Sequence, residues 1–223
     1  MDIRRVVSCY MASNMYAVCE GEYAVLIDPC EKHIPRLKAE ILIATHEHFD
    51  HISGVNFWKA KSGASFICSE TCAKACKDPR RNLSRYFSAF CELQSWVKCD
   101  IPADPGDYSC EADEVYSGSM SFQWRGHEFT LFECPGHSQG GQCILLDGKI
   151  LFSGDSLING FKTSCNSPGG SLRKWREYSM PKIQSLSRNL VVYPGHLDSF
   201  ILKDYDDGTR NFWTKEAGNV PID

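Results

Sequence analysis

The segment Thr45–Gly54 constrains this chain more than any other stretch, because it gathers three histidines and an aspartate within six residues. These four side chains are His46, His48, Asp50 and His51. The segment directly follows the apolar run Ile41–Ala44, which predicts a buried strand. Polar side chains that leave the end of a rigid strand are held close together. The pattern therefore predicts a metal site.

The composition is that of an ordinary soluble globular protein, with 43% hydrophobic and 23% charged residues among 223. This length suffices for one domain with a real core, and we expect a single domain over residues 1–223. The formal charge of −4 gives no attraction to nucleic acid, and no window is apolar enough for a membrane span. The segment Val6–Glu20 favours a strand over a signal peptide, so we expect a cytoplasmic protein that acts on a small molecule.

The chain has twelve cysteines, which would be paired in a secreted protein and free thiols or metal ligands in a cytosolic one. Without a signal peptide, and with a core of this size, reduced thiols are favoured. Cys68, Cys72 and Cys76 are spaced by four, which places them on one face of a helix. A second metal site there would lack the CxxC pairs of zinc ribbons, so small buried hydrophobic side chains are the favoured interpretation.

The hydrophobic pattern predicts strands and helices in alternation along the chain. The predicted strands are residues 16–19, 23–27, 41–44, 65–67, 143–146, 150–152 and 190–193, with β-like alternation over 115–134. The predicted helices are residues 31–38, 52–60 and 171–186. Residues 69–110 are less regular and are expected to form short helices and loops, as an insertion or lid over the site. This order predicts an α/β protein with two sheets and helices outside them.

Three further strand ends each deliver a metal-ligand side chain after a turn. His137 follows Pro135-Gly136, Asp155 follows Ser153-Gly154, and His196 follows Pro194-Gly195. Imidazole nitrogen and carboxylate oxygen suit zinc, and they also suit iron or manganese. The four strand ends together therefore predict one shared metal centre.

The motif His46-x-His48-x-Asp50-His51, followed in order by His137, Asp155 and His196, is similar to that of the metallo-β-lactamase fold superfamily. The resemblance covers about residues 14–200 and includes a hairpin, Tyr16–Asp28, that ends in an aspartate. It implies an αββα four-layer sandwich of two mixed β-sheets flanked by helices.

The same resemblance implies a binuclear metallohydrolase with two divalent metal ions, zinc being favoured and iron or manganese possible. One ion would be held by His46, His48 and His137. The other would be held by Asp50, His51 and His196, and Asp155 would bridge the two. A metal-activated hydroxide would be the nucleophile, and Asp50 would orient it or accept its proton.

Within the superfamily the chain most resembles the glyoxalase II branch, which implies hydrolysis of a thioester or ester-like bond. Glyoxalase II enzymes usually show a Gly-His-Thr-x-Gly-His segment, whereas this chain has Gly136-His137-Ser138-Gln139-Gly140-Gly141 and lacks the second histidine. The short stretch after His196 also leaves no room for a glutathione-binding domain. The alternatives are a mononuclear iron oxidoreductase such as a persulfide dioxygenase, and a lactonase or β-lactamase-type hydrolase.

The residues around and between the candidate ligands have less specific patterns. Lys162, Arg173 and Lys174 could meet a substrate carboxylate or phosphate, although a solvated basic loop is favoured. Between the ligands, Glu47 is predicted to be solvated and Phe49 to pack against neighbours. His33 and His127 lie outside the ligand pattern and are predicted to be ordinary surface residues.

Overall fold

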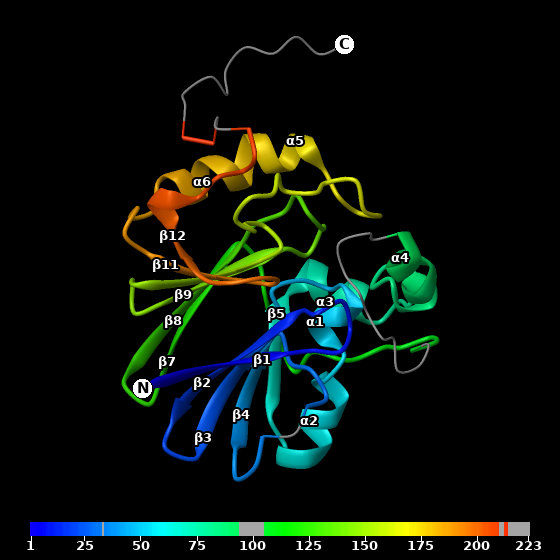
Figure 1. Cartoon of the computed structure of the whole chain (residues 1–223). Coiled ribbons are helices and arrows are strands. Elements are labelled where there is room, and N and C mark those ends of the chain that lie inside the picture. Colours follow the sequence, from blue (N-terminus) through cyan, green and yellow to red (C-terminus); the bar gives the residue numbers. More distant parts are fainter. Residues whose placement is uncertain (33, 94–104, 210–211, 214–223) are drawn as a thin grey trace.

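A computed structural model describes residues 1–32, 34–93, 105–209 and 212–213. Two β-sheets face each other, and helices cover their outer faces (Figure 1). The strands are β1 (Asp2–Val7), β2 (Asn14–Glu20), β3 (Tyr23–Ile27), β4 (Lys38–Ile43), β5 (Ser65–Ser69), β6 (Glu114–Tyr116), β7 (Ser119–Trp124), β8 (His127–Glu133), β9 (Gln142–Leu146), β10 (Ile150–Gly154), β11 (Val191–Pro194) and β12 (Phe200–Ile201). The helices are α1 (Phe49–Ile52), α2 (Val55–Ser62), α3 (Glu70–Cys76), η1 (Ser84–Tyr86), α4 (Phe87–Leu93), α5 (Leu172–Lys174), η2 (Trp175–Ser179), α6 (Met180–Gln184) and η3 (Leu202–Asp204).

Each sheet has six strands and mixes parallel with antiparallel pairs. The first has the order β1-β2-β3-β4-β5-β6, with parallel pairs from β3 to β6. The second has the order β12-β11-β10-β9-β8-β7, and β10 and β11 are its parallel pair. The predicted hairpins over residues 16–27 and 143–152 are both confirmed. The predicted fold class, two mixed sheets flanked by helices, is correct.

The core forms layers because the central strands are buried on both faces. In β2, Met15, Ala17 and Cys19 contact the outer cluster under the helices of the first sheet. The alternate residues Tyr16 and Val18 point into the space between the sheets. This alternation follows from the two-residue period of a strand, and it explains why β2 reads as a continuous buried run.

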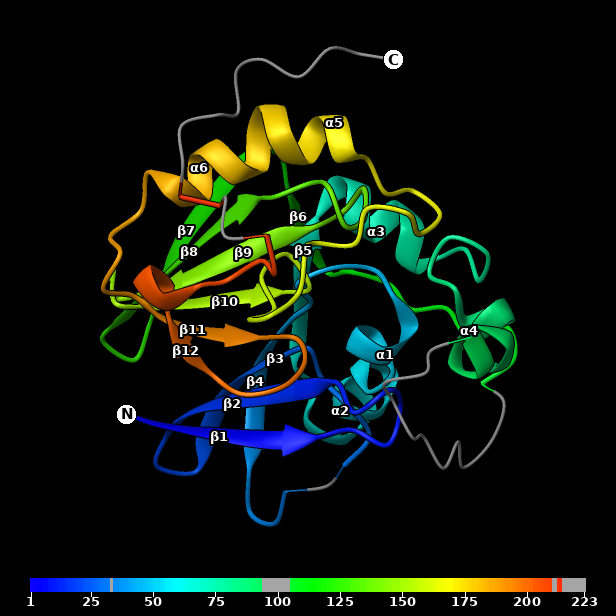
Figure 2. The same ribbon diagram turned by 45° about the horizontal axis from the view of Figure 1, so that its top comes forward.

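Helices close both outer faces of the sandwich (Figure 2). Trp58 of α2 is fully buried against the first sheet, and its indole N–H donates to the Cys30 carbonyl at 2.8 Å. On the other side, Trp175 of η2 and Ile183 of α6 pack with Leu151 of β10. The helical segment predicted over residues 171–186 is therefore confirmed, and it covers the outer face of the second sheet.

The helix predicted over residues 31–38 is wrong. The described residues of this stretch form a turn that leads into β4. Pro35 disfavours helical geometry at Ile34 before it, and Arg36 adopts a left-handed backbone with φ of 62°. The helix predicted over 52–60 is instead divided into α1 and α2.

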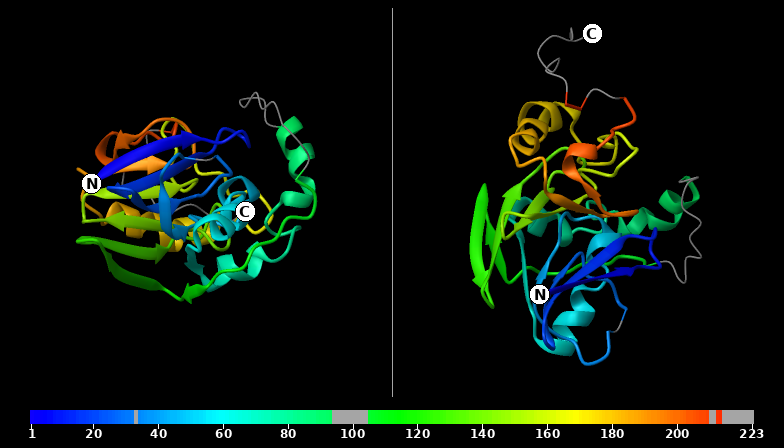
Figure 3. Two further views of the ribbon diagram at one scale, coloured as in Figure 1. Left: turned by 90° about the horizontal axis from the view of Figure 1, so that it is seen from below. Right: turned by 60° about the vertical axis from the view of Figure 1, so that its left-hand side comes forward.

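The irregular stretch after β5 contains α3, η1 and α4, which agrees with the predicted short helices. Both views in Figure 3 show α4 at one side of the molecule, beyond the two sheets. The predicted insertion or lid also includes residues 94–104, which lie outside the described residues, so its role as a lid stays a prediction. None of the helices in the described ranges is both long and apolar enough to cross a membrane.

Candidate metal centre

Four loops at one edge of the sandwich carry the predicted ligands. His46 and His48 follow β4, Asp50 and His51 lie in α1, His137 follows β8, Asp155 follows β10, and His196 follows β11. Since β10 and β11 are parallel neighbours, their carboxyl ends bring Asp155 and His196 to the same edge. The structure therefore brings together all seven residues that the sequence singled out.

The first ligand group consists of three buried imidazoles. Nε2 of His46 lies 3.1 Å from Nδ1 of His48, which in turn lies 3.1 Å from Nε2 of His137. Other contacts fix two of these rings: Thr45 Oγ1 lies 3.1 Å from His46 Nδ1, and the Ser164 carbonyl lies 2.8 Å from His137 Nδ1. These three imidazoles would hold one metal ion, since their ligand atoms all lie within 4.8 Å of one another.

The second group combines imidazole with carboxylate. Asp50 Oδ2 lies 3.3 Å from His51 Nε2 and 3.5 Å from His196 Nε2. Within this group, as within the first, the ligand atoms all lie within 4.8 Å of one another. The set of one carboxylate and two imidazoles is one that zinc, iron and manganese accept.

Asp155 lies between the two groups. Its Oδ2 is 3.5 Å from His137 Nε2 of the first group and 3.5 Å from His196 Nε2 of the second. Its Oδ1 is 3.4 Å from His51 Nε2. A single carboxylate thus reaches both ligand sets.

Burial keeps the three histidines of the first group neutral, and the neutral imidazole is the form that binds metal. Burial, together with the neighbouring imidazoles, lowers the pKa of His46 well below its ordinary value. It also lowers the pKa of His48 to about 3 and the pKa of His137. Because a metal ion binds the neutral imidazole, these histidines need not lose a proton before binding.

The second group has the electrostatics of a cation site. Burial opposes protonation of His51 and His196, yet the carboxylates outweigh it and raise the pKa of both, that of His196 to about 9. Burial likewise opposes ionisation of Asp50, but the charges of His51 and His196 hold the pKa of its carboxyl well below the usual range. The carboxylates of Asp50 and Asp155 stabilise the protons on these two imidazoles. They would stabilise a divalent cation in place of those protons.

Buried polar atoms without a hydrogen bond test whether the residues fit a metal. Nε2 of His51 and Oδ1 of Asp155 are both buried and make no hydrogen bond to any residue that the structure describes. They approach each other at 3.4 Å, and His51 Nε2 approaches Asp50 at 3.3 Å, as ion-pair contacts within the ligand set itself. Buried polar atoms are seldom left in this state without a ligand or an ion. Both atoms face the site, so the donor set fits metal ions.

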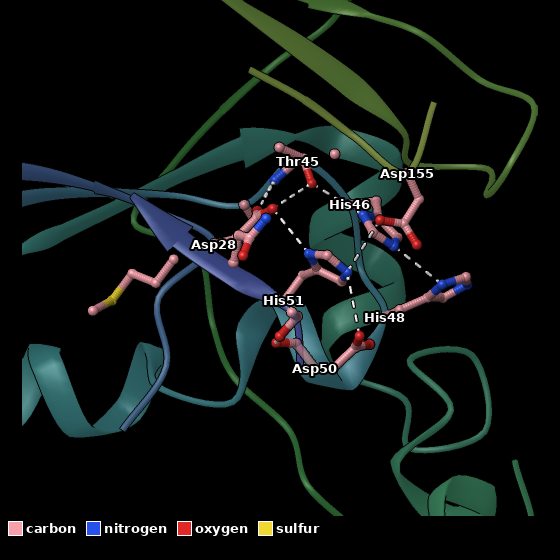
Figure 4. Close-up of polar contacts among 12 residues, drawn as sticks. Asp28, Thr45, His46, His48, Asp50, His51 and Asp155 are labelled. Atoms are coloured by element: carbon pink, nitrogen blue, oxygen red, sulfur yellow. Dashed lines mark hydrogen bonds and ion pairs between the residues drawn. The ribbon is translucent and has the colours of Figure 1, made fainter. Parts of the chain in front are cut away.

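Asp28, at the end of the opening hairpin, supports the ligands from behind (Figure 4). Its Oδ2 lies 2.9 Å from His51 Nδ1 and accepts from Thr45 Oγ1 at 2.8 Å, while Oδ1 accepts from Thr45 N at 2.6 Å. A carboxylate on the far nitrogen fixes the orientation of a ligand histidine. The sequence marked Asp28 only as the end of a hairpin, because its partner His51 lies in a different element.

Glu47 corrects the sequence prediction of a solvated residue, since only 3% of it is exposed. Its carboxylate accepts from Ser138 Oγ at 2.9 Å and from Gly140 N at 3.1 Å. Burial opposes ionisation and raises the pKa of Glu47. Glu47 therefore ties the loop after β4 to the loop that carries His137, a role that its position between two ligands did not reveal.

Two glycines allow these loops to approach closely. A Cβ on Gly195 would lie 2.2 Å from Asp155 Oδ1 and 2.7 Å from His51 Cε1. Gly154 has φ of 50°, and a Cβ there would lie 2.3 Å from Thr45 Oγ1. The turns predicted from these glycines are thus also the places where the ligand loops touch.

A cavity of about 170 Å³ opens over the ligands, and His48, Asp50, His137, Asp155 and His196 form part of its lining. Among the predicted substrate residues, Lys162 lines this cavity. Arg173 and Lys174 are exposed on α5 and are not among the lining residues described. Phe49 packs against Phe87 with ring centroids 5.1 Å apart, as its predicted packing role requires.

Three aliphatic residues of the cavity lining have strained backbones. Met11, Leu83 and Leu197 have φ of 51°, 66° and 64°, in the left-handed region. This conformation costs about 1–2 kcal/mol per residue for side chains other than glycine. Such strain persists only where the surrounding structure enforces it, and it concentrates at functional sites.

The cysteines of the middle segment lie in the core and not at the cavity. Cys68, Cys72 and Cys76 are fully buried in the outer cluster of the first sheet, and the Sγ atoms of Cys72 and Cys76 are 3.8 Å apart. Within the described part of the chain, the groups able to hold a metal ion contain histidine and aspartate but no cysteine. The interpretation of these thiols as buried hydrophobic side chains agrees with their burial.

Comparison with known sequences reveals one family. The model of the metallo-β-lactamase superfamily matches residues 11–196. The chain is 23% identical to a probable metallo-hydrolase of Streptococcus pyogenes, over 88% of this chain and 84% of that protein. It is 21% identical to a hydroxyacylglutathione hydrolase of Francisella tularensis, over 94% of this chain and 75% of that protein.

Comparison with solved structures indicates the same fold. The BLEG-1 B3 metallo-β-lactamase superimposes with a TM-score of 0.78 at 21% identity, over 96% of this chain and all of that one. The protein TTHA1623, solved in a di-iron-bound form, gives a TM-score of 0.64 at 23% identity, over 90% and 96% of the two chains. At these identities the likeness concerns the fold, while the reaction has to be argued from the site.

Proposed function

The chain belongs to the metallo-β-lactamase superfamily, and we propose that it is a binuclear, zinc-dependent hydrolase of thioester or ester-like bonds in a small molecule. The observation that carries the proposal is the position of Asp155, whose carboxylate reaches both His137 and His196. A lone structural ion needs one closed ligand set, whereas here two sets share a carboxylate beside an open cavity.

We assign His46, His48 and His137 to one ion, and Asp50, His51 and His196 to the other. When bound, two such ions supply an activated water and polarise the carbonyl of the substrate. Asp28 holds the His51 ring in place for this role. Asp50, which lines the cavity, is positioned to orient the attacking water and accept its proton.

A thioester or ester substrate is consistent with the hydroxyacylglutathione hydrolases among the relatives, because hydroxyacylglutathione is a thioester. We do not assign glutathione to this chain, because Gly141 stands where that branch usually has its second histidine. A Cβ at Gly141 would lie 2.6 Å from the Cys134 carbonyl oxygen, so the local backbone leaves no space for a side chain.

We further propose that the enzyme works in the cytoplasm. The cysteines in the described ranges are free thiols, most of them buried. Free thiols in this number suit a reducing compartment.

Metal analysis of the purified protein together with a substrate screen tests the proposal. We expect close to two zinc ions per chain and turnover of carbonyl thioesters or esters. Asp155→Ala should lose metal and most activity, whereas the exposed Asp204→Ala should keep both. A single iron with oxygen uptake on a persulfide would instead support the alternative iron oxidoreductase, and the absence of turnover for any thioester, ester or lactone would refute the hydrolase.

A further inference from the structure

The lining of the cavity over the ligands combines apolar with polar side chains. One apolar group of lining residues consists of Met11, Leu83, Phe87 and Phe90, and a second consists of Ile158 and Phe161. Polar groups come from Lys162 and its neighbours, and Lys162 is the only lysine or arginine among the described residues that line the cavity. A substrate in this cavity therefore meets both hydrocarbon and polar groups.

We propose that the first apolar group together with Leu197, which we call the acyl wall (Met11, Leu83, Phe87, Phe90 and Leu197), binds a hydrocarbon acyl group of the substrate. This inference rests on the proposed hydrolase function and narrows its substrate class to esters or thioesters of aliphatic acids. The wall is continuous with the ligands, since Asp50 and His196 line the same cavity.

The Phe87 ring of the acyl wall is packed against two other aromatic rings. Phe87 and Phe90 are three apart in α4 and so share one face of that helix. Behind them Phe87 packs edge-to-face on Tyr10 and Phe49, with centroids 5.6 and 5.1 Å away. A wall packed in this way presents a preformed apolar surface, which favours binding of hydrocarbon over a flexible polar group.

The strained residues of the wall are held in place by their neighbours. The Leu197 carbonyl accepts from Asn14 Nδ2 at 2.8 Å and from Arg5 at 2.9 Å. Leu83 lies between Asn82 and Ser84, which are both buried. The backbone N–H of Ser84 donates to Asn82 Oδ1 at 2.9 Å. A residue without a Cβ would fit these left-handed positions at lower cost, so the surrounding contacts must hold the backbone in this conformation.

Leu197 shows most clearly that the wall is not merely part of the core. This residue is 47% exposed although its backbone is in the left-handed region. It directly follows His196 and lines the cavity. An exposed, strained leucine gains little from packing in the folded protein, whereas contact with a substrate would account for it.

A series of acyl thioesters with one leaving group, from acetyl to octanoyl, tests the acyl wall in the zinc-loaded protein. We expect kcat/KM to rise about fourfold for each methylene group that the wall covers, which corresponds to ~0.8 kcal/mol. Phe90→Ala and Leu197→Gly should reduce the ratio of octanoyl to acetyl kcat/KM at least tenfold.

Direct binding provides a measurement that does not depend on turnover. Calorimetric titration with decanoate should give at least fivefold weaker binding in Phe90→Ala than in the unchanged protein. Two controls should bind like the unchanged protein: Tyr86→Ala, which removes an exposed ring next to the wall, and Arg125→Gly, which relaxes a left-handed residue in a remote hairpin.

The outcomes separate the two proposals. If thioesters are hydrolysed but the rate does not depend on acyl length, the acyl wall is refuted and the hydrolase stands. Loss of the octanoyl preference in the Tyr86→Ala control to the same extent as in Phe90→Ala would also refute the wall. If no ester is hydrolysed, the hydrolase fails, and decanoate binding alone then decides whether the wall takes hydrocarbon.

Discussion

Oδ2 of Asp28 lies 2.9 Å from Nδ1 of His51, and both side chains are almost fully buried. The contact joins the end of β3 to α1, elements that are separate in sequence. It directs the other ring nitrogen, Nε2, towards Asp50 and Asp155. The orientation of one proposed ligand thus depends on a residue that cannot touch the metal itself.

Asp28→Asn should weaken the second proposed metal site. The amide keeps the size of the side chain but removes the charge behind His51, and loss of such a partner typically lowers metal affinity 10–100-fold. Zinc titration against a chromophoric chelator measures this change. Asp113→Asn, which alters a carboxylate bonded to a backbone N–H far from the site, is the control and should bind zinc normally. Equal affinity in both variants would show that Asp28 does not position the ligand.

Glu47→Ala should destabilise the fold by about 1–3 kcal/mol, since it leaves the buried Ser138 hydroxyl and Gly140 N–H without an acceptor. Urea unfolding of the metal-free protein measures the loss. Glu47→Gln keeps an acceptor oxygen and should lose less. Glu111→Ala, at an exposed carboxylate, should change stability by less than about 1 kcal/mol. A stability for Glu47→Ala equal to that of Glu111→Ala would contradict the buried role.

Gly195→Ala should abolish binding of at least one metal ion, because the new Cβ would have to displace Asp155 Oδ1, 2.2 Å away. Metal content after dialysis against zinc is the measurement. Gly148→Ala serves as the control, as its left-handed position has nothing within 4 Å of the added Cβ. That variant should lose only about 1–2 kcal/mol of stability and keep its metal. Normal metal content in Gly195→Ala would mean that the loops do not approach as closely as described.

His127 predicts a pH-dependent contribution to stability away from the metal centre. Its hydrogen bonds with Asp147 and Glu20 raise its pKa above the ordinary 6.5 although burial opposes protonation. A raised pKa gives stabilisation that is fully present below about pH 6.5 and is lost as the pH rises through the pKa of the folded state. His127→Gln should therefore reduce the free energy of unfolding more at pH 5.5 than at pH 9, by less than about 1 kcal/mol because the ion pairs are near the surface. An equal loss of unfolding free energy at pH 5.5 and pH 9 would contradict a contribution from these ion pairs. His33, the other histidine outside the ligand pattern, lies outside the described residues.

The elements that the sequence predicted well are those with a strong local pattern. The hairpin around Asp147-Gly148 is confirmed because this dipeptide favours the left-handed geometry of a tight turn. The predicted helix over residues 31–38 is wrong because Pro35 disfavours helical geometry at the residue before it. Glu47 was misjudged for a related reason: its polarity suggested solvent, while a contact with the distant loop around Gly140 decided its burial.

The sequence by itself determined the candidate ligand residues, since seven imidazole and carboxylate side chains placed after turns at strand ends are a local pattern. It also determined the two-sheet architecture, because the hydrophobic periodicity of strands and helices is visible among residues that are close in the sequence. Only the tertiary structure decided what surrounds the ligands. Asp28, Glu47 and the acyl wall act through contacts between segments far apart in the chain, and no local pattern encodes such contacts. The candidate ligands form the proposed metal centre, and these long-range contacts orient its side chains and shape the cavity beside it.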